Sequence, residues 1–158
     1  MANGIVIYYS RSGNTKQMAQ LISGAMNEAG LRTDCKPVDE VKPDELLNYD
    51  ALVLGSPTYY GQMAWPLKQL LDDIVKWHGK LDGKVGAAFS SSANIAGGNE
   101  TTILGIIEAM LIHGMIVQGD YQGDHYGPVS INEPDARVTA QCRRRGQRIA
   151  KLTLKLFS

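Results

Sequence analysis

Short apolar runs alternate with longer stretches of helical periodicity along the whole chain. Strands are expected at residues 5–9, 32–38, 51–54 and 85–89 and from residue 115, and helices at 14–29, 62–77 and 100–113 and from about residue 132. Strands that alternate with helices form a parallel sheet joined by right-handed crossovers. We therefore predict an α/β fold with a doubly wound five-stranded parallel sheet, strand order 2-1-3-4-5, in three α/β/α layers.

The bulk composition is that of one ordinary globular domain. The chain has 158 residues, is 44% hydrophobic and 20% charged, and has a formal net charge of zero, so we expect a single domain over residues 1–158. Nothing in this balance points to nucleic acid or a membrane surface, and no signal peptide or membrane span is expected. Cys35 and Cys142 form no metal-binding spacing with the scattered histidines. We expect no metal, reduced thiols and a cytoplasmic protein.

A hydroxyl-rich turn follows the first expected strand and leads into the first helix. Its residues are Ser10, Arg11, Ser12, Gly13, Asn14 and Thr15. Backbone N–H groups of such a turn and of the helix start attract an anion, and the hydroxyls add donors. The turn has neither the lysine of a nucleoside-triphosphate loop nor the glycine pattern of a dinucleotide site, so it suits a single terminal phosphate. A plain Ser/Gly turn with a Thr or Asn helix cap is the alternative.

Three loops follow neighbouring strands of the expected sheet: 10–15, 55–61 and 90–98. The carboxyl ends of parallel strands lie at one edge of the sheet, so these loops should converge there. The middle loop adds Tyr59 and Tyr60, which can stack on a planar ring, and the third offers backbone groups among small residues. Together the loops predict a site for a mononucleotide with a large planar ring.

The helical periodicity also predicts which side chains face the core. The expected inward-facing residues of the two C-terminal helices are Ile103, Ile106, Ile107, Met110 and Leu111, then Val138, Cys142, Ile149, Leu152 and Leu156.

Over nearly its whole length the sequence resembles the flavodoxin-like FMN proteins. The resemblance is carried by three segments: 8–15 (Tyr-Tyr-Ser-Arg-Ser-Gly-Asn-Thr), 49–61 and 89–92. Within this group it is most similar to the multimeric NAD(P)H:quinone oxidoreductases once called tryptophan-repressor-binding proteins, through segments 61–63, 97–102, 113–115 and 126–127. Compared with these enzymes, the chain is short at 38–46 and at 72–81, on the substrate side.

The resemblance implies an FMN site and assigns residues to it. Residues 10–15 would hold the phosphate, and two further loops would contact the ring and the ribityl chain. The residues of these loops are Pro57, Thr58, Tyr59, Tyr60 and Gly61, then Ser91, Ser92, Ala93, Asn94, Ile95, Ala96 and Gly97. The resemblance also implies a homo-oligomer, a dimer or a tetramer, in which neighbouring subunits help to wall the site.

Three further residues have candidate roles. The resemblance places His113 near the flavin ring, where it would orient the acceptor or stabilise negative charge on the reduced substrate. The alternative is a histidine at a helix C-terminus that interacts with the helix dipole. His125 and Tyr126 belong to a Gly/Tyr/Asp-rich loop that could cover the site, and we include them in its lining.

Two functions remain open. The first is a reductase in which FMN carries electrons from NAD(P)H to a quinone or a similar small acceptor. The second is a flavodoxin-type carrier that docks on redox proteins; the zero net charge and the lack of Asp and Glu in 90–98 argue against a low-potential carrier. A phosphoacceptor domain or a cysteine phosphatase is excluded, because the loops lack the required carboxylates and cysteine.

Overall fold

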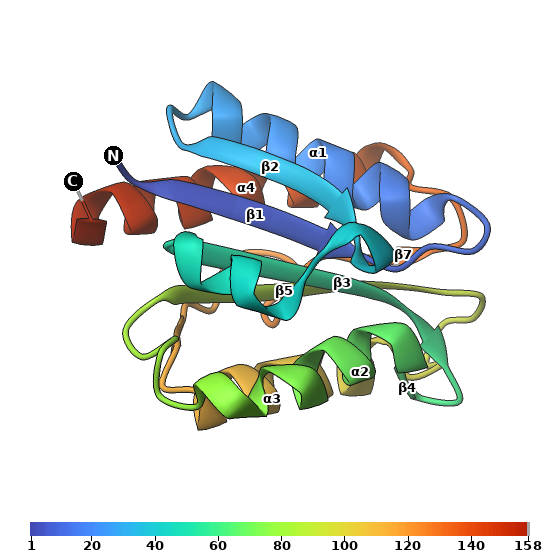
Figure 1. Ribbon diagram of the computed structural model, residues 1–158. Coiled ribbons are helices and arrows are strands. Elements are labelled where there is room, and N and C mark those ends of the chain that lie inside the picture. The colour runs from blue at the N-terminus through green and yellow to red at the C-terminus, as the bar shows by residue number, and fades with distance from the viewer. Residues whose placement is uncertain (158) are drawn as a thin grey trace.

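The computed structural model describes residues 1–157 and shows a twisted parallel sheet between two helical layers (Figure 1). The strands are β1 (Asn3–Tyr8), β2 (Arg32–Pro37), β3 (Ala51–Tyr59), β4 (Gln62–Met63), β5 (Val85–Ser92), β6 (Ile116–Val117) and β7 (Val129–Ile131). The sheet order is β2-β1-β3-β5-β6, and each neighbouring pair in this path is parallel. This confirms the predicted fold class and strand order.

Two helices cover each face of the sheet. α1 (Asn14–Glu28) and α4 (Ala136–Phe157) pack together on one face, and α2 (Trp65–Asp73) and α3 (Asn99–Ile112) lie on the other (Figure 1). Short 3₁₀ turns complete the chain at Val38–Glu40, Pro43–Asn48 and Ile74–Trp77. Within residues 1–157, no helix has the length and apolar character that a membrane crossing requires.

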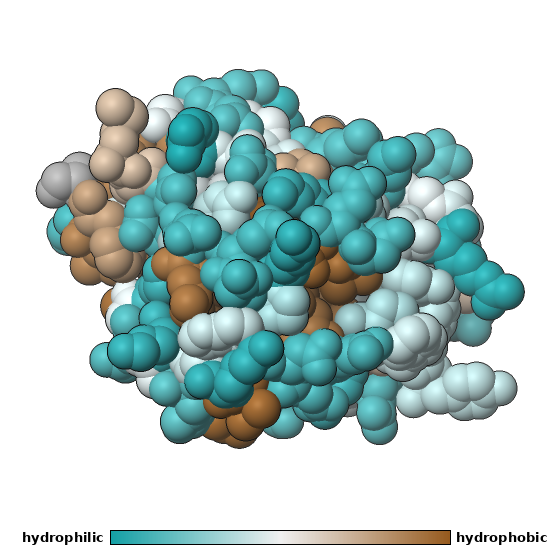
Figure 2. All heavy atoms as spheres, viewed as in Figure 1, coloured by the Kyte–Doolittle hydropathy of each residue, from teal (hydrophilic) through white to brown (hydrophobic). Residues whose placement is uncertain are grey.

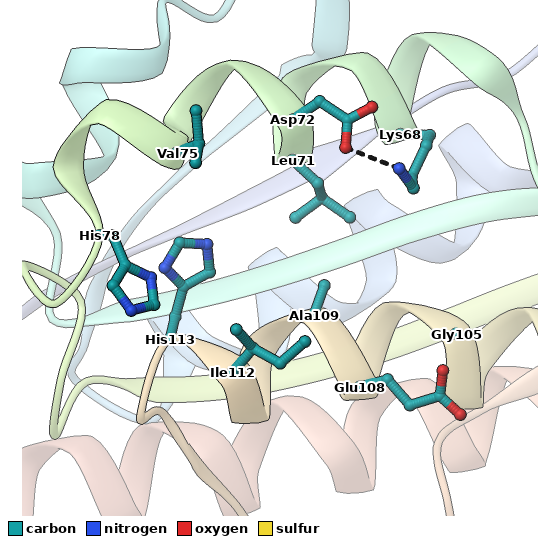
Figure 3. Close-up of a pocket in the computed structure, with 10 residues that line it drawn as sticks. All are labelled: Lys68, Leu71, Asp72, Val75, His78, Gly105, Glu108, Ala109, Ile112 and His113. Carbon is teal, nitrogen blue, oxygen red and sulfur yellow. Dashed lines mark hydrogen bonds and ion pairs between the residues drawn. The ribbon is translucent and has the colours of Figure 1, made fainter.

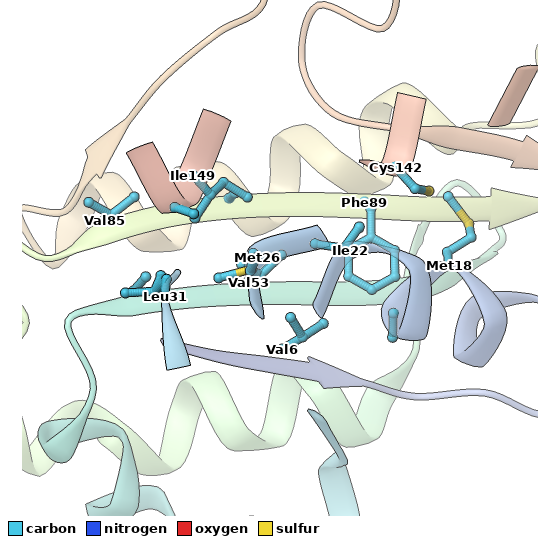
Figure 4. Close-up of a cluster of buried hydrophobic side chains, with 14 of the residues drawn as sticks. Val6, Met18, Ile22, Met26, Leu31, Val53, Val85, Phe89, Cys142 and Ile149 are labelled. Atoms are coloured by element: carbon cyan, nitrogen blue, oxygen red, sulfur yellow. The ribbon is translucent and has the colours of Figure 1, made fainter. Parts of the chain in front are cut away.

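Each helical layer has its own hydrophobic core against the sheet. On the α1/α4 side, Phe89 from β5 packs among Val6, Met18, Ile22 and Cys142, all fully or almost fully buried (Figure 4). Burial also raises the pKa of the Cys142 thiol to about 12, so this cysteine is an inert part of the core. The sheet is therefore held rigidly from both sides, and its carboxyl edge is a fixed platform.

The fifth predicted strand is split into two short pieces. β6 pairs with the start of β5 at Val85 and Gly86, whereas β7 pairs with its end at residues 90–92. The segment 118–128 between them leaves the sheet and lies against α4. Arg145 is 4% exposed and donates to the carbonyl oxygen of Gln118 at 2.6 Å, and Asp120 accepts two 2.8 Å bonds from Arg144. Buried polar groups of α4 thus fix a loop that is otherwise irregular.

Three arginines of α4 form ion pairs with carboxylates of other segments. Arg143 pairs with Glu28 at 2.6 Å, and Arg144 and Arg148 both reach Asp120. Paired guanidinium groups do not form a free basic patch of the kind that binds a phosphate backbone.

Two central strands run further than their apolar segments predict. β3 extends to Tyr59 and β5 to Ser92, with Ser56 beside Ser90 and Pro57 beside Ser91 in the ladder. The backbone pairing continues because small polar side chains at these positions fit between the layers. As a result, parts of the predicted loops 55–61 and 90–98 are strand.

The helix expected at 62–77 is also shorter. Residues 62 and 63 instead form β4, which pairs antiparallel with β3. The helix begins at Trp65 with Pro66 in its first turn, where a proline is tolerated, and its last turn, from Ile74, is 3₁₀.

Two side chains expected in the core are exposed instead. Leu111 is 58% exposed and Leu156 is 46% exposed. Both lie in the last turn of a helix, beside its buried face and not on it: Met110 and His113 are buried on either side of Leu111, and Thr153 is buried one turn before Leu156. The other expected core residues of these helices are buried or partly buried.

Candidate functional site

The turn before α1 presents unpaired backbone donors. Gly13 has φ 102° and precedes the helix, which begins at Asn14 without a side-chain cap. The Ser10 hydroxyl accepts the N–H of Gly13 at 3.1 Å and so fixes the turn. The first N–H groups of a helix have no partners within it, so those of Asn14 and Thr15 point toward the end of the helix. This arrangement contradicts the alternative in which Asn or Thr caps the helix.

A cavity of about 270 Å³ opens in front of these donors at the carboxyl edge of the sheet. Segments from the three predicted loops line it together, with one further residue after β7. The lining residues are Arg11, Ser12, Asn14, Thr15, Pro57, Thr58, Tyr59, Ser91, Ser92, Ala93 and Asn132. The predicted convergence of the loops is therefore present in the structure.

Asn132 is the lining residue that sequence reasoning missed. Its N–H donates to the carbonyl oxygen of Ser92 at 2.8 Å, directly after the β5–β7 pairing. The segment Asn132–Asp135 looks like the start of a helix, which hid the fact that a strand ends at Ile131. The available signal was an asparagine that directly follows a strand at the carboxyl edge of the sheet.

Buried hydroxyls join the strand ends behind the cavity. The hydroxyl oxygens of Thr15 and Ser91 are 2.9 Å apart, and those of Thr58 and Ser90 are 3.0 Å apart. Thr102, at the start of α3, donates to Thr58 at 3.2 Å. Because these groups are buried and paired, the loops have a fixed spacing before any ligand enters.

The loops on either side of the cavity are exposed and locally strained. Tyr60 is fully exposed and residues 93–97 are all exposed. Within residues 1–157, the non-glycine residues with positive φ are Tyr60, Ala96 and Asn132, and all three belong to loops at this edge. Such conformations are unfavourable for residues with a side chain and are concentrated at functional sites.

The two exposed loops, 57–61 and 93–98, are also in direct contact. Thr101 donates to the carbonyl oxygen of Gly61 at 2.7 Å. Gly98 has φ 101°, and a Cβ there would lie 2.6 Å from the Cα of Gly61. Only glycine allows this approach, which holds loop 57–61 against loop 93–98.

The cavity lining is suited to an anion. Arg11 is its one charged residue, and hydroxyls and an amide side chain supply the remaining polar groups. The N-terminus of α1 adds the positive end of a helix dipole. A negative group is thus favoured at this end of the cavity.

Not every predicted site residue lines the cavity. Tyr60 and Gly61 lie on an adjoining hollow with Gln62 and Thr101, and Ile95 and Ala96 on another with Val129 and Ile131. Ser10 and Gly13 shape the turn behind the lining, while Asn94 and Gly97 complete the exposed loop.

His113 lies far from the cavity within one chain. It is the C-cap residue of α3, and this helix of 14 residues spans about 21 Å from the site edge. The imidazole is 8% exposed and its ring centroid is 5.8 Å from that of His78. Burial lowers the pKa of His113 and so favours the neutral ring, and the neighbouring His78 acts in the same direction. This is the helix-terminal position of the alternative interpretation.

His125 and Tyr126 lie on the loop that α4 fixes. The Nδ1 atom of His125 is 2.8 Å from the carbonyl oxygen of Asp120, and Tyr126 is half exposed. Neither residue belongs to the cavity lining.

The sheet order, the layers and the edge cavity make this a doubly wound α/β protein with its candidate site at the switch point between strands. Residues 6–104 match the flavodoxin family model. A flavodoxin of Aquifex aeolicus is 40% identical over 96% of this chain and 86% of its own length. The chain belongs to the flavodoxin family.

Other relatives have enzyme names. An NAD(P)H dehydrogenase (quinone) of Azorhizobium caulinodans is 32% identical over 99% of this chain and all of its own length. Among solved structures, an archaeal flavodoxin has a TM-score of 0.80 at 31% identity, covering 96% of this chain and 99% of its own. A WrbA-like flavodoxin of Agrobacterium tumefaciens has a TM-score of 0.85 at 24% identity, with 99% coverage of both chains, and supports the fold.

Proposed function

We propose that this chain binds FMN with its phosphate in the turn 10–15. The unpaired N–H groups at the start of α1, the hydroxyls of Ser12 and Thr15, and Arg11 are the donors that a phosphate monoester requires. The lining contains no carboxylate that would repel the anion. Membership of the flavodoxin family supports the same ligand.

The exposed loops would hold the rest of the cofactor. Tyr59 and Tyr60 on one side and residues 93–97 on the other offer aromatic and small-residue surfaces to a planar ring. The hydroxyl-joined strand ends beneath them would keep these surfaces at a fixed separation. Bound FMN would supply the redox chemistry, while the protein would position it and set its surroundings.

We further propose that the chain is an oxidoreductase that takes electrons from NAD(P)H and reduces quinones or similar small acceptors. The observation that carries this proposal is the full-length similarity to proteins named NAD(P)H dehydrogenase (quinone), at 32% to 34% identity. The open loops leave room for a donor or an acceptor beside the ring. The free thiols Cys35 and Cys142 are compatible with action in the cytoplasm.

A one-electron carrier is the second candidate, and a specific observation favours it. The alignment with the Aquifex flavodoxin spans 161 positions, close to the 158 residues of this chain, whereas that with the Azorhizobium enzyme spans 199. The chain therefore aligns with this flavodoxin with few gaps, whereas its alignment with the enzyme contains segments that have no counterpart in this chain. For a carrier, the partner would be a redox protein that docks at the site edge.

Titration of flavin-free protein with FMN and with riboflavin tests the phosphate assignment. Riboflavin has the same ring and ribityl chain without the phosphate, so FMN should bind at least 100-fold more tightly. Equal affinities would mean that the turn 10–15 does not hold the phosphate. Steady-state oxidation of NADH and NADPH with a water-soluble quinone then separates the reductase from the carrier.

A further inference from the structure

The turn between β3 and β4 holds an aromatic residue in an unfavourable backbone conformation. Tyr59 pairs with Gln62, so Tyr60 and Gly61 form a two-residue hairpin turn. Both have positive φ, 50° and 77°, as a type I′ turn requires. Glycine adopts such angles freely, but a tyrosine does not, and asparagine, aspartate or glycine is the usual first residue of this turn. The conformation of Tyr60 therefore depends on contacts that hold the turn in place.

The side chain of Tyr60 does not supply these contacts. It is fully exposed, and within residues 1–157 it forms no hydrogen bond or ring contact. Figure 2 shows side chains that stand out from the surface at the edge of the molecule where Figure 1 places this turn. Since the side chain is free, the backbone of the turn alone decides where the aromatic ring lies.

The first turn of α3 holds the hairpin turn from outside. The Thr101 hydroxyl donates to the carbonyl oxygen of Gly61 at 2.7 Å. Gly98, which directly precedes the helix, lies so close that a Cβ on it would be 2.6 Å from the Cα of Gly61. Because α3 follows directly on loop 93–98, its first turn joins the two loops that would hold the flavin ring.

The two threonines of this helical turn have different surroundings. Thr102 is fully buried, and its hydroxyl donates to that of Thr58 in the layer behind the FMN cavity. Thr101 is exposed, and its hydroxyl contacts only backbone carbonyl oxygens, at 2.7 Å for Gly61 and 2.9 Å for Gly98. A hydroxyl has one proton to donate, and Gly61 is the nearer acceptor. Thr101 is thus the residue whose hydroxyl can be removed without a change in the core.

We infer that the Thr101 hydroxyl is a positioning group for the flavin ring. Its bond to the Gly61 carbonyl fixes the turn that carries Tyr60, and with it the separation between Tyr60 and loop 93–98. A surface that is already in place before the ligand enters binds it more tightly. The inference rests on the proposed FMN site, because the ring has to lie between these two loops. It assigns Thr101 to the ring and leaves the phosphate to the turn 10–15.

Titration of flavin-free Thr101→Val protein with FMN and with riboflavin tests this role. The variant keeps the shape of the side chain and loses one hydrogen bond, so both flavins should bind about 3- to 10-fold more weakly. Because both contain the ring, the ratio of the two affinities should stay as in the wild type. Thr101→Ser keeps the hydroxyl and is the matched control, which should bind both flavins like the wild type. An unchanged riboflavin affinity in Thr101→Val, or an equal loss in Thr101→Ser, would overturn the inference.

Hydrogen exchange of flavin-free protein tests the contact without a ligand. In Thr101→Val the backbone amides of residues 59–63 should exchange faster than in the wild type, while those of residues 85–89 in β5 should be unchanged. Thr101→Ser should match the wild type throughout. Unchanged exchange in residues 59–63 of Thr101→Val would overturn the inference even if FMN binds. A wild-type protein that binds neither flavin would contradict the FMN proposal itself, and with it the role assigned to Thr101.

Discussion

Ser12 offers the most direct residue-scale test of the phosphate position. Ser12→Glu would place a carboxylate among donors that are arranged for an anion, and the two negative charges would repel each other. We expect FMN affinity to fall by on the order of 100-fold, which corresponds to about 2.8 kcal/mol. Fluorescence titration of flavin-free protein measures the change.

The control for that substitution is Ser12→Gln, which has a similar size and no charge. It should lose far less affinity than Ser12→Glu. Full retention of FMN by Ser12→Glu would show that the phosphate lies elsewhere.

The buried hydroxyl pair of Thr15 and Ser91 provides a stability prediction. Thr15→Val keeps the shape of the side chain but leaves the Ser91 hydroxyl without its partner in a buried position. A buried unpaired group costs about 1–3 kcal/mol, and we expect flavin-free protein to lose that much in urea unfolding. Adding Ser91→Ala to this variant should cost less than the sum of the two single changes.

Thr153→Val is the matched control for Thr15→Val. Thr153 is also a buried helical threonine, but its hydroxyl donates within α4 to the carbonyl oxygen of Ile149. Removing it leaves no side chain unpaired, so its effect should be smaller. Equal losses in the two variants would mean that the Thr15–Ser91 bond does not join the loops.

At the scale of elements, the alternation of apolar runs and helical periodicity was sufficient to predict the sheet order and the layers. The ends of the strands were harder to predict. β3 and β5 continue through Ser56 and Ser90, whose small polar side chains are more typical of loops. β7 was hidden in a Gly-rich segment, since its pairing depends on β5 and not on its own residues.

The candidate site was likewise predictable only where it depends on local sequence. The hydroxyl-rich turn and the three converging loops could be predicted, because each follows a strand of known place in the sheet. Asn132 could not, because it depends on the hidden strand β7. The role of His113 near the flavin stays a prediction from sequence resemblance, and within one chain this residue lies at the far end of α3, as the length of the helix requires.

The loop 118–128 gives a pH-dependent prediction. The Arg144 guanidinium beside Asp120 holds the pKa of this carboxyl at about 2, below its usual 3.8. A lowered folded-state pKa stabilises the fold above the unfolded pKa, and this contribution is lost as the pH falls from about 4 to about 2. Because the arginines are partly exposed to solvent, we expect it to be on the order of 1 kcal/mol.

Urea unfolding of wild type and Asp120→Asn from pH 2 to pH 7 measures this contribution. The difference in unfolding free energy should be constant above about pH 4 and shrink toward pH 2. A difference that does not change with pH would show that the Asp120 charge does not anchor the loop to α4.

For the whole molecule, the fold separates two hollows. The carboxyl edge of the sheet carries the candidate FMN cavity, and the outer face of α2 and α3 carries a larger hollow lined by Leu71, Val75, Ala109 and Ile112 (Figure 3). The two have no lining residue in common, so substitutions in the second hollow should leave FMN binding unchanged. Ile112→Asp protein should therefore still bind FMN as tightly as the wild type.

The most direct measurement of the proposed activity is an anaerobic visible spectrum of FMN-loaded protein before and after addition of NADH or NADPH. We predict that FMN binds in a one-to-one ratio and that a pyridine nucleotide rapidly bleaches its visible absorption band, with colour restored by a quinone. A protein that binds FMN but is bleached only by a chemical reductant would contradict the reductase and favour the electron carrier. A protein that takes up no FMN would contradict the entire proposal.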